Sequence, residues 1–207
     1  CPTCFSTFRA TNTKGSGADY KGVFNFDTGG IQNTSTFLLD WKNEQFLSGG
    51  VSAERDRTGL AFEHIMHFAS GFTISGAVRH DFHDVFQDFT SWRIAGSQRF
   101  ASGTRLHSSA GTGITLPTFF QQFGFNLPFV GNPNLKPETS LGWDFGIEQT
   151  FLNGLFVADI TYFSINADDA ITGFGNTAIN AIGISKRRGI EFTDKYNPFA
   201  WLTFEGT

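Results

Sequence analysis

The chain reads GNPNLKPET over residues 131–139 and SLGWDFGIEQTF over residues 140–151. From Leu141 to Phe151 every second residue is large and apolar except Gln149, as Trp143 and Phe145 show, and mostly small or acidic residues lie between. A period of two indicates a β-strand with one apolar and one polar face. The alternation lasts for about a dozen residues, longer than a typical globular strand. A soluble sandwich would bury the apolar face against a second sheet, whereas a membrane barrel would turn it to lipid.

The composition favours the membrane alternative. Charged residues make up 16% of the 207 residues, below the roughly 25% of ordinary soluble domains. No run of about 18 apolar residues is present, which excludes a transmembrane helix. Low charge and 26 Phe residues without a spanning helix are typical of a transmembrane β-barrel. The net charge of −4 gives no basic surface, so no nucleic-acid partner is expected.

Turn signals divide the chain into about twelve candidate strands. Short turns are expected near residues 15–17, 42–44, 70–71, 102–103, 153–154 and 197–198. Longer loops are expected near residues 27–34, 54–59, 81–89, 112–138 and 166–183. Short connections on one side and long ones on the other predict an all-β, antiparallel, up-and-down transmembrane barrel. Aromatic residues near strand ends fit two girdles, with Trp41 beside a short turn and Trp143 beside a long loop.

The ends of the chain suggest a partial barrel. The sequence starts at Cys1 and stops at Thr207 within an expected strand, so we expect a fragment of a longer protein. Cys1 and Cys4 form a C-x-x-C pair that fits a loop disulfide, incidental thiols or half of a metal site. The sequence leaves these alternatives open.

Several motifs resemble the barrel of TonB-dependent outer-membrane receptors. They are GTGITLPTF at residues 111–119, the GNPNLKPE loop, and the strand that follows with Gly146 and Glu148. Downstream, the segments at residues 162–163, 168–171 and 188–191 are similar to later family landmarks, and GAVRHD at residues 76–81 resembles the family's G-x-R-x-D strand.

This resemblance implies a barrel of about 22 strands around a plug domain. Residues 1–207 would form part of that barrel domain, with the plug and the terminal strands absent. The resemblance also implies a place in the bacterial outer membrane, in contact with its lipid. It implies energy-coupled uptake of a scarce small molecule such as a ferric siderophore or cobalamin. The TonB energy-coupling protein would act through the missing plug region, and no cofactor is expected.

A long loop between Leu116 and Phe129 is the candidate ligand-binding segment. Aromatic rings alternate there with amides, which suits a bulky amphipathic ligand, although packing of the loop on itself is an alternative. The candidate residues are Phe119, Phe120, Gln121, Gln122, Phe123, Phe125 and Asn126.

The next segment is expected to be structural. Its two prolines fix the backbone and remove two amide donors, and its asparagines can cap turns. The residues of this motif are Asn132, Pro133, Leu135, Lys136, Pro137 and Glu138.

Metal binding is not expected. His64 and His67 are three residues apart, as are His80 and His83, so on a strand each pair points to opposite faces.

Catalysis is not expected either. Four carboxylates fall on polar strand faces, and we interpret them as a hydrated lumen wall with Arg79 and Arg187 as counter-charges. They are Asp144, Glu148, Asp159 and Glu191. No catalytic triad motif, phosphate loop or dinucleotide fingerprint is present, so the protein is predicted not to be an enzyme. Two other classes stay open: a secreted carbohydrate-binding sandwich and a passive porin without a plug.

Overall fold

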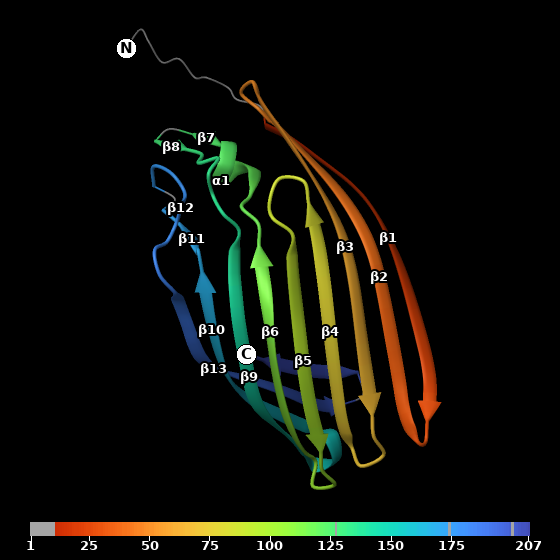
Figure 1. Ribbon diagram of the computed structural model, residues 1–207. Helices are drawn as coiled ribbons and strands as arrows, with labels where there is room; N and C mark the ends of the chain where they lie inside the picture. The colour runs from red at the N-terminus through yellow and green to blue at the C-terminus, as the bar shows by residue number, and fades with distance from the viewer. Residues whose placement is uncertain (1–10, 127, 174, 200) are drawn as a thin grey trace.

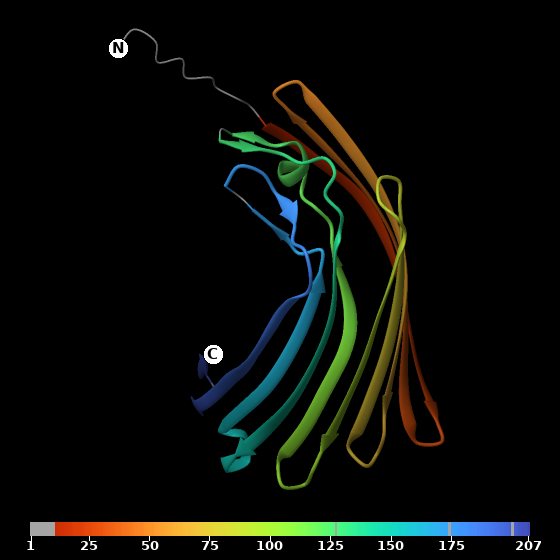
Figure 2. The ribbon, with the colours of Figure 1, turned by 60° about the vertical axis from the view of Figure 1, so that its left-hand side comes forward.

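The fold was obtained as a computed structural model that describes residues 11–126, 128–173, 175–199 and 201–207. One antiparallel sheet of ten strands contains most of them, in the order β1-β2-β3-β4-β5-β6-β9-β10-β13-β14. Figure 1 traces this meander, and Figure 2 shows that the sheet curves strongly. Each strand of the sheet pairs with the next one along the chain, which is the up-and-down arrangement of a barrel wall.

The strands differ widely in length. Those of the main sheet are β1 (Thr11–Thr28), β2 (Ile31–Ser48), β3 (Val51–His67), β4 (Phe72–His83), β5 (Phe89–Arg99), β6 (Thr104–Thr115), β9 (Glu138–Phe151), β10 (Phe156–Asp168), β13 (Ser185–Phe199) and β14 (Leu202–Gly206). The connections hold α1 (Phe119–Phe123), β7 (Phe125–Asn126), β8 (Phe129–Val130), the short turn of 3-10 helix η1 (Leu152–Gly154), β11 (Ile171–Thr172) and β12 (Ile179–Asn180). No helix within the described residues is long and apolar enough to cross a membrane.

The predicted all-β antiparallel class is confirmed. The main sheet has ten strands where the sequence indicated about twelve. The remaining strands are two residues long and form the small hairpins β7–β8 and β11–β12 within the loops. Cys1 and Cys4 lie outside the described residues.

One face of the sheet is apolar and uncovered. Large side chains stand exposed on it from β1 to β13, among them Tyr20, Phe24, Leu39, Phe62, Val78, Ile94, Trp143, Phe145, Ile160 and Phe192. Within the described residues, no second sheet packs against them. The chain is therefore not a two-layer sandwich, because in a sandwich the apolar face of each sheet packs against the other sheet.

Connections on one side of the sheet are short. They are the Gly29-Gly30 turn, the segment from Phe68 to Gly71, the segment from Phe100 to Gly103, and the turn that contains η1. The long connections, residues 116–137 and 169–184, lie at the opposite end (Figure 1). An exception is the two-residue Gly49-Gly50 turn on the long-loop side, where both glycines have positive φ as such a hairpin requires.

Several expected turns and loops are wrong. Residues 15–17, 42–44 and 54–59 continue the strands β1, β2 and β3 without a break in register. Strands β1 and β2 have 18 residues each. At about 3.3 Å per residue and a tilt of about 40° such strands rise about 45 Å, well above an apolar band of about 25 Å. Their upper parts therefore stand in water, where polar residues on both faces resemble a loop.

Trp41 marks the level at which these strands leave the apolar band. Beyond it, on the same face, Asn43 donates hydrogen bonds to Glu54 (2.8 Å) and Asp56 (3.2 Å), and Gln45 donates to Glu54 (3.0 Å). Trp41 thus belongs to the long-loop girdle, and its expected place beside a short turn is corrected.

Candidate functional site

The polar face of the sheet, called the inner face below, carries the charged residues. Directly paired residues of an antiparallel sheet point to the same side, and the register pairs Asp40 with Gly59 and Gly59 with Asp81. These three positions share the inner face, opposite to Leu39 and Leu60. Asp81 is only 5% exposed there although no apolar side chain of the outer face can reach it. Its neighbours on the same face are Arg57 and Arg79, which it contacts, and Phe89, with which it is paired.

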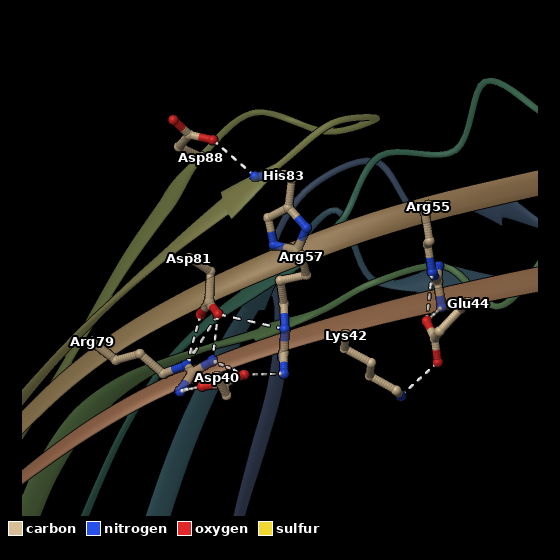
Figure 3. Close-up of polar contacts among 9 residues, drawn as sticks. All are labelled: Asp40, Lys42, Glu44, Arg55, Arg57, Arg79, Asp81, His83 and Asp88. Atoms are coloured by element: carbon tan, nitrogen blue, oxygen red, sulfur yellow. Dashed lines mark hydrogen bonds and ion pairs between the residues drawn. The ribbon is translucent and has the colours of Figure 1, made fainter. Parts of the chain in front are cut away.

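Arg79 is at the centre of this charged group (Figure 3). Its guanidinium reaches Asp40 (Nη1 to Oδ2, 2.7 Å) and Asp81 (Nη2 to Oδ1, 2.6 Å). Arg57 adds a second bond to Asp40 (Nη2 to Oδ1, 2.9 Å). Two cations and two anions therefore neutralise one another across β2, β3 and β4.

Gly59 makes this arrangement possible. A Cβ atom at this position would lie 2.0 Å from Arg79 Nη2 and 2.7 Å from Asp40 Oδ2. Any side chain on Gly59 would block the path of Arg79 across β3. The glycine is needed for the close approach of the guanidinium, not for an unusual backbone angle.

A second charged cluster lies nearer to the long loops. Arg55 contacts Glu44 (Nη2 to Oε2, 2.7 Å), and Lys42 contacts the same carboxylate (Nζ to Oε1, 2.6 Å). These residues lie above Trp41 and so outside the apolar band. Burial alone would raise the pKa of Glu44, but hydrogen bonds from Lys42 and Arg55 lower this pKa below its usual value.

Arg55 also holds the loop that contains α1. Its Nη1 donates to the carbonyl oxygen of Pro117 (2.8 Å), and its guanidinium carbon lies 4.4 Å from the centre of the Phe119 ring. Phe119 stacks on Phe46 of β2, with ring centres 5.5 Å apart. The loop between β6 and β9 thus folds over the inner face and rests on the β2–β3 hairpin. Figure 2 shows α1 at this end of the sheet.

The candidate ligand-binding residues are divided among several roles. Phe119 packs on Phe46 with Phe123 beside it, at 6.5 Å between ring centres. Gln121 closes a capping box with Thr118, so its side chain is occupied by the start of α1. Gln122 is buried. These residues lie close together because the loop packs on itself and on β2. The side-chain amides of Gln121 and Gln122 do not form one shared polar surface.

Phe120 differs from its neighbours. Its ring stacks on Phe129 at 4.9 Å between centres, yet 49% of the residue stays exposed. Phe125 and Asn126 form strand β7 and pair with Val130 and Phe129.

The GNPNLKPE motif joins the two long loops. Asn132 accepts a hydrogen bond from the Asn134 amide and donates to the Ala178 carbonyl, both at 3.0 Å. The Lys136 amide donates to Asn180 (2.9 Å), and Glu138 accepts from the Ile171 amide (3.2 Å).

Leu135 of this motif packs in the small apolar cluster between the loops. The cluster consists of Phe129, Leu135 and Ala178, with Ile171 against it. The prolines Pro133 and Pro137 flank it without amide hydrogens, as in any X-Pro segment that does not pair as a strand. This cluster is a structural centre at the long-loop end of the sheet.

The carboxylates of β9 and β10 on the inner face are not paired with Arg79 and Arg187, the counter-charges predicted from the sequence. Glu148 pairs with Arg105 (2.7 Å) and Arg99 (3.3 Å), and His107 Nε2 contacts Asp159 Oδ2 at 2.7 Å. Asp144 accepts hydrogen bonds from the Ser109 amide (3.1 Å) and hydroxyl. The assignment of Arg79 to these carboxylates is wrong, because its guanidinium binds Asp40 and Asp81 instead. No ion pair of Arg187 is present among the described residues.

Several residues of these clusters were not singled out from the sequence, among them Asp40, Phe46 and Arg55. Only the strand register could have identified them, because each lies on the inner face at the same level along the strands as the residues it contacts. A single sequence does not reveal which residues lie opposite each other when strand lengths are misjudged. In the described part of the chain, no group of three or more His, Cys, Asp or Glu residues could hold a metal ion.

Comparisons with known proteins agree with this geometry. The family model described as "TonB dependent receptor-like, beta-barrel" matches residues 5–207. The vitamin B12 transporter BtuB of Photobacterium profundum is 29% identical over 148 residues, which are 70% of this chain and 23% of that protein.

Solved structures show the same fold. The siderophore receptor PirA from Pseudomonas aeruginosa superposes with a TM-score of 0.80 at 18% identity, over 96% of this chain and 42% of that one. A mutant of the ferric enterobactin receptor PfeA from Pseudomonas aeruginosa, in complex with enterobactin, gives 0.77 at 17% identity, over 94% and 35%.

The chain spans less than half the length of each of these relatives. The family model nevertheless covers almost the whole chain, and the solved structures share its fold. The chain therefore belongs to the TonB-dependent receptor-like β-barrel family, whose members sit in the bacterial outer membrane as transporters and are not enzymes.

Proposed function

We propose that the receptor to which this wall belongs takes up a scarce, bulky small molecule, either a ferric siderophore or cobalamin. Uptake would be driven by the TonB energy-coupling protein acting through a plug domain that residues 1–207 do not include. In this proposal the segment supplies part of the barrel wall and part of the outer mouth. The relatives support it by their names, which include a vitamin B12 transporter and siderophore receptors.

The observation that carries the proposal is the loop over the inner face. It is held at both ends, by Arg55 and Phe46 on one side and by the loop cluster around Leu135 on the other. A loop fixed in this way can present a side chain without a large loss of conformational entropy on binding. The exposed ring of Phe120 is the surface that it presents, and an aromatic face suits a large amphipathic ligand.

The test compares Phe120→Ala with the wild-type full-length receptor. Truncation of an exposed aromatic contact should weaken binding by about 1–2 kcal/mol, or roughly five- to thirtyfold. Affinity is measured by fluorescence quenching of the purified receptor, separately with cyanocobalamin and with ferric enterobactin. The matched control is Phe151→Ala, a similarly exposed ring beside the short turns, which should leave affinity within about twofold.

Several outcomes would decide against the proposal. Binding of neither probe would contradict the proposed ligand class. Equal affinity of Phe120→Ala and wild type for a probe that binds would remove Phe120 from the ligand contact. Uptake that is unchanged in cells without TonB would indicate a passive pore. Loss of affinity in both variants would indicate a general effect on the barrel.

A further inference from the structure

Arg93 lies in the middle of β5 on the inner face and borders two adjoining hollows of the wall. The lower hollow has a volume of about 220 Å³ and the upper hollow, nearer to the long loops, about 370 Å³. Arg93, Ser109 and Asp144 line both of them. Ala95 lines the lower hollow, where its small side chain leaves the space open.

The guanidinium of Arg93 differs from its neighbours in having no carboxylate partner among the described residues. Its only side-chain bond there is a long one to Ser109 (3.4 Å), and the Ser109 hydroxyl donates to Asp144. In contrast, Arg79 and Arg105 each contact a carboxylate at 2.7 Å. Because a guanidinium carries five N–H donors, most of those of Arg93 are available to a molecule in the lumen.

Hydroxyl groups surround this cation. Ser75 and Ser97 line the lower hollow and Ser140 lines the upper one. The register places Ser75 and Ser109 on either side of Ala95. Within the described part of the chain, the hydroxyls of Ser75, Ser97 and Ser140 make no hydrogen bond. Hydroxyl and guanidinium donors together suit a molecule that is rich in oxygen acceptors.

The two hollows lie below the loop that carries Phe120. This loop leaves β6 after Thr115 and enters β9 at Glu138, and these strands are neighbours in the wall (Figure 1). The upper hollow reaches Gly113 and Ser140, which are paired two residues below the loop ends of β6 and β9. The polar hollows therefore extend from the outer mouth to the middle of the wall.

We propose that Arg93 and the hydroxyls around it contact the transported ligand after it leaves the mouth, so that its path through the lumen follows β5, β6 and β9. The inference rests on the proposed uptake function. It adds to that function a place on the wall and a chemical requirement, namely oxygen acceptors on the ligand. Arg93 acts in passage, whereas the first capture is assigned to Phe120.

The test separates capture from passage in the full-length receptor. Equilibrium affinity is measured by fluorescence quenching, and TonB-dependent uptake is measured in cells with radiolabelled cyanocobalamin and ferric enterobactin. Ala95→Phe fills the lower hollow and should slow uptake of the probe that binds by about tenfold or more, with affinity within about twofold of wild type. The matched control Thr34→Phe is on β2 at the same level of the register, outside both hollows, and should leave uptake within about twofold.

Arg93→Gln tests the chemistry without filling the hollow. Loss of a hydrogen bond from a charged group should slow uptake by about tenfold at unchanged affinity, and Arg93→Lys should recover at least about a third of the wild-type rate. Arg187→Gln is the matched control. Arg187 is an exposed inner-face arginine on β13 at the same level of the register, and it lines neither hollow. Its uptake should stay within about twofold of wild type.

Several results would overturn the inference. Wild-type uptake in both Ala95→Phe and Arg93→Gln would mean that the ligand passes elsewhere. Equal losses in each variant and its control would indicate a general effect on the lumen, and a parallel loss of affinity would place Arg93 in capture. If the wild-type receptor binds neither probe, the proposed ligand class fails and the inference fails with it. Heat-modifiable mobility on electrophoresis identifies folded barrels, and Arg93→Gln decides if Ala95→Phe does not fold.

Discussion

Arg79 shows how a single residue of this wall depends on its neighbours. It reaches across Gly59 to Asp40 because β3 has no side chain at the crossing point. The resulting cluster is neutral, so it holds three strands together without creating a strong field in the lumen. The inner face also carries cations outside this cluster, for example Arg93, whose only side-chain bond in the described residues is a long one to Ser109 (3.4 Å).

Replacement of Arg79 should therefore destabilise the barrel. Arg79→Ala leaves two carboxylates together without their main cation, and for a half-buried, wet site we expect a loss of about 1–2 kcal/mol in the free energy of unfolding. Arg93→Ala is the control and should cost less than about 0.5 kcal/mol. Urea unfolding of the refolded receptor in detergent, followed by tryptophan fluorescence, measures both. Equal losses would mean that the Asp40–Arg79–Asp81 contacts do not contribute.

The charges of the inner face were only partly predictable at this scale. The alternation placed Glu148 and Asp159 on the polar face, where the structure has them. Their partners Arg105 and His107 come from β6, which contains few large apolar residues. Pairing depends on register between strands, and register is set by the length of each strand and turn.

At the scale of elements, the β2–β3 hairpin is the support of the outer mouth. It rises above the apolar band, and its inner face carries Phe46, which is only 3% exposed because Phe119 covers it. The hairpin and the α1 loop are separated by 62 residues along the chain at the Arg55–Pro117 contact. The long strands β2 and β3 thus extend far enough to contact the α1 loop and hold it over the lumen.

Arg55→Ala should release the α1 loop. This change removes the bond to Pro117 and the contact with the Phe119 ring, and exchange of amide hydrogens at residues 119–124 should speed up by roughly tenfold. Lys42→Ala is the control, since Lys42 binds the same Glu44 without touching the loop. Hydrogen exchange followed by mass spectrometry gives the rates. If protection of residues 119–124 is the same in both variants, Arg55 does not hold the loop.

The misjudged turns belong to this scale as well. Residues 42–44 and 54–59 are polar on both faces, which on sequence alone favours a loop. They form strands because backbone pairing across the hairpin continues where neither face needs to be apolar. Sequence patterning reports the environment of a strand, and it fails where the strand passes from lipid into water.

The whole molecule exposes two kinds of surface that water does not tolerate. Its outer face is apolar from β1 to β13, and the described sheet ends in the open edges β1 and β14. Exposed apolar patches and long unpaired edges both promote association.

Residues 1–207 produced alone should therefore aggregate in detergent-free buffer. Size-exclusion chromatography with light scattering should give material in the void volume, and a detergent micelle should be required to keep the chain dispersed. The full-length receptor in the same detergent is the reference. A monodisperse, folded monomer in plain buffer would contradict the assignment of the outer face to lipid.

The sequence by itself determined the strand class, the two-faced character of the wall and the family motifs. These properties are local, because a period of two and a proline-rich loop are visible within one segment. Only the tertiary structure decided which charges pair, where the strands leave the membrane, and which residues support the loop over the lumen. Those features depend on contacts between strands that lie far apart in the chain, and a register that no single segment contains fixes them.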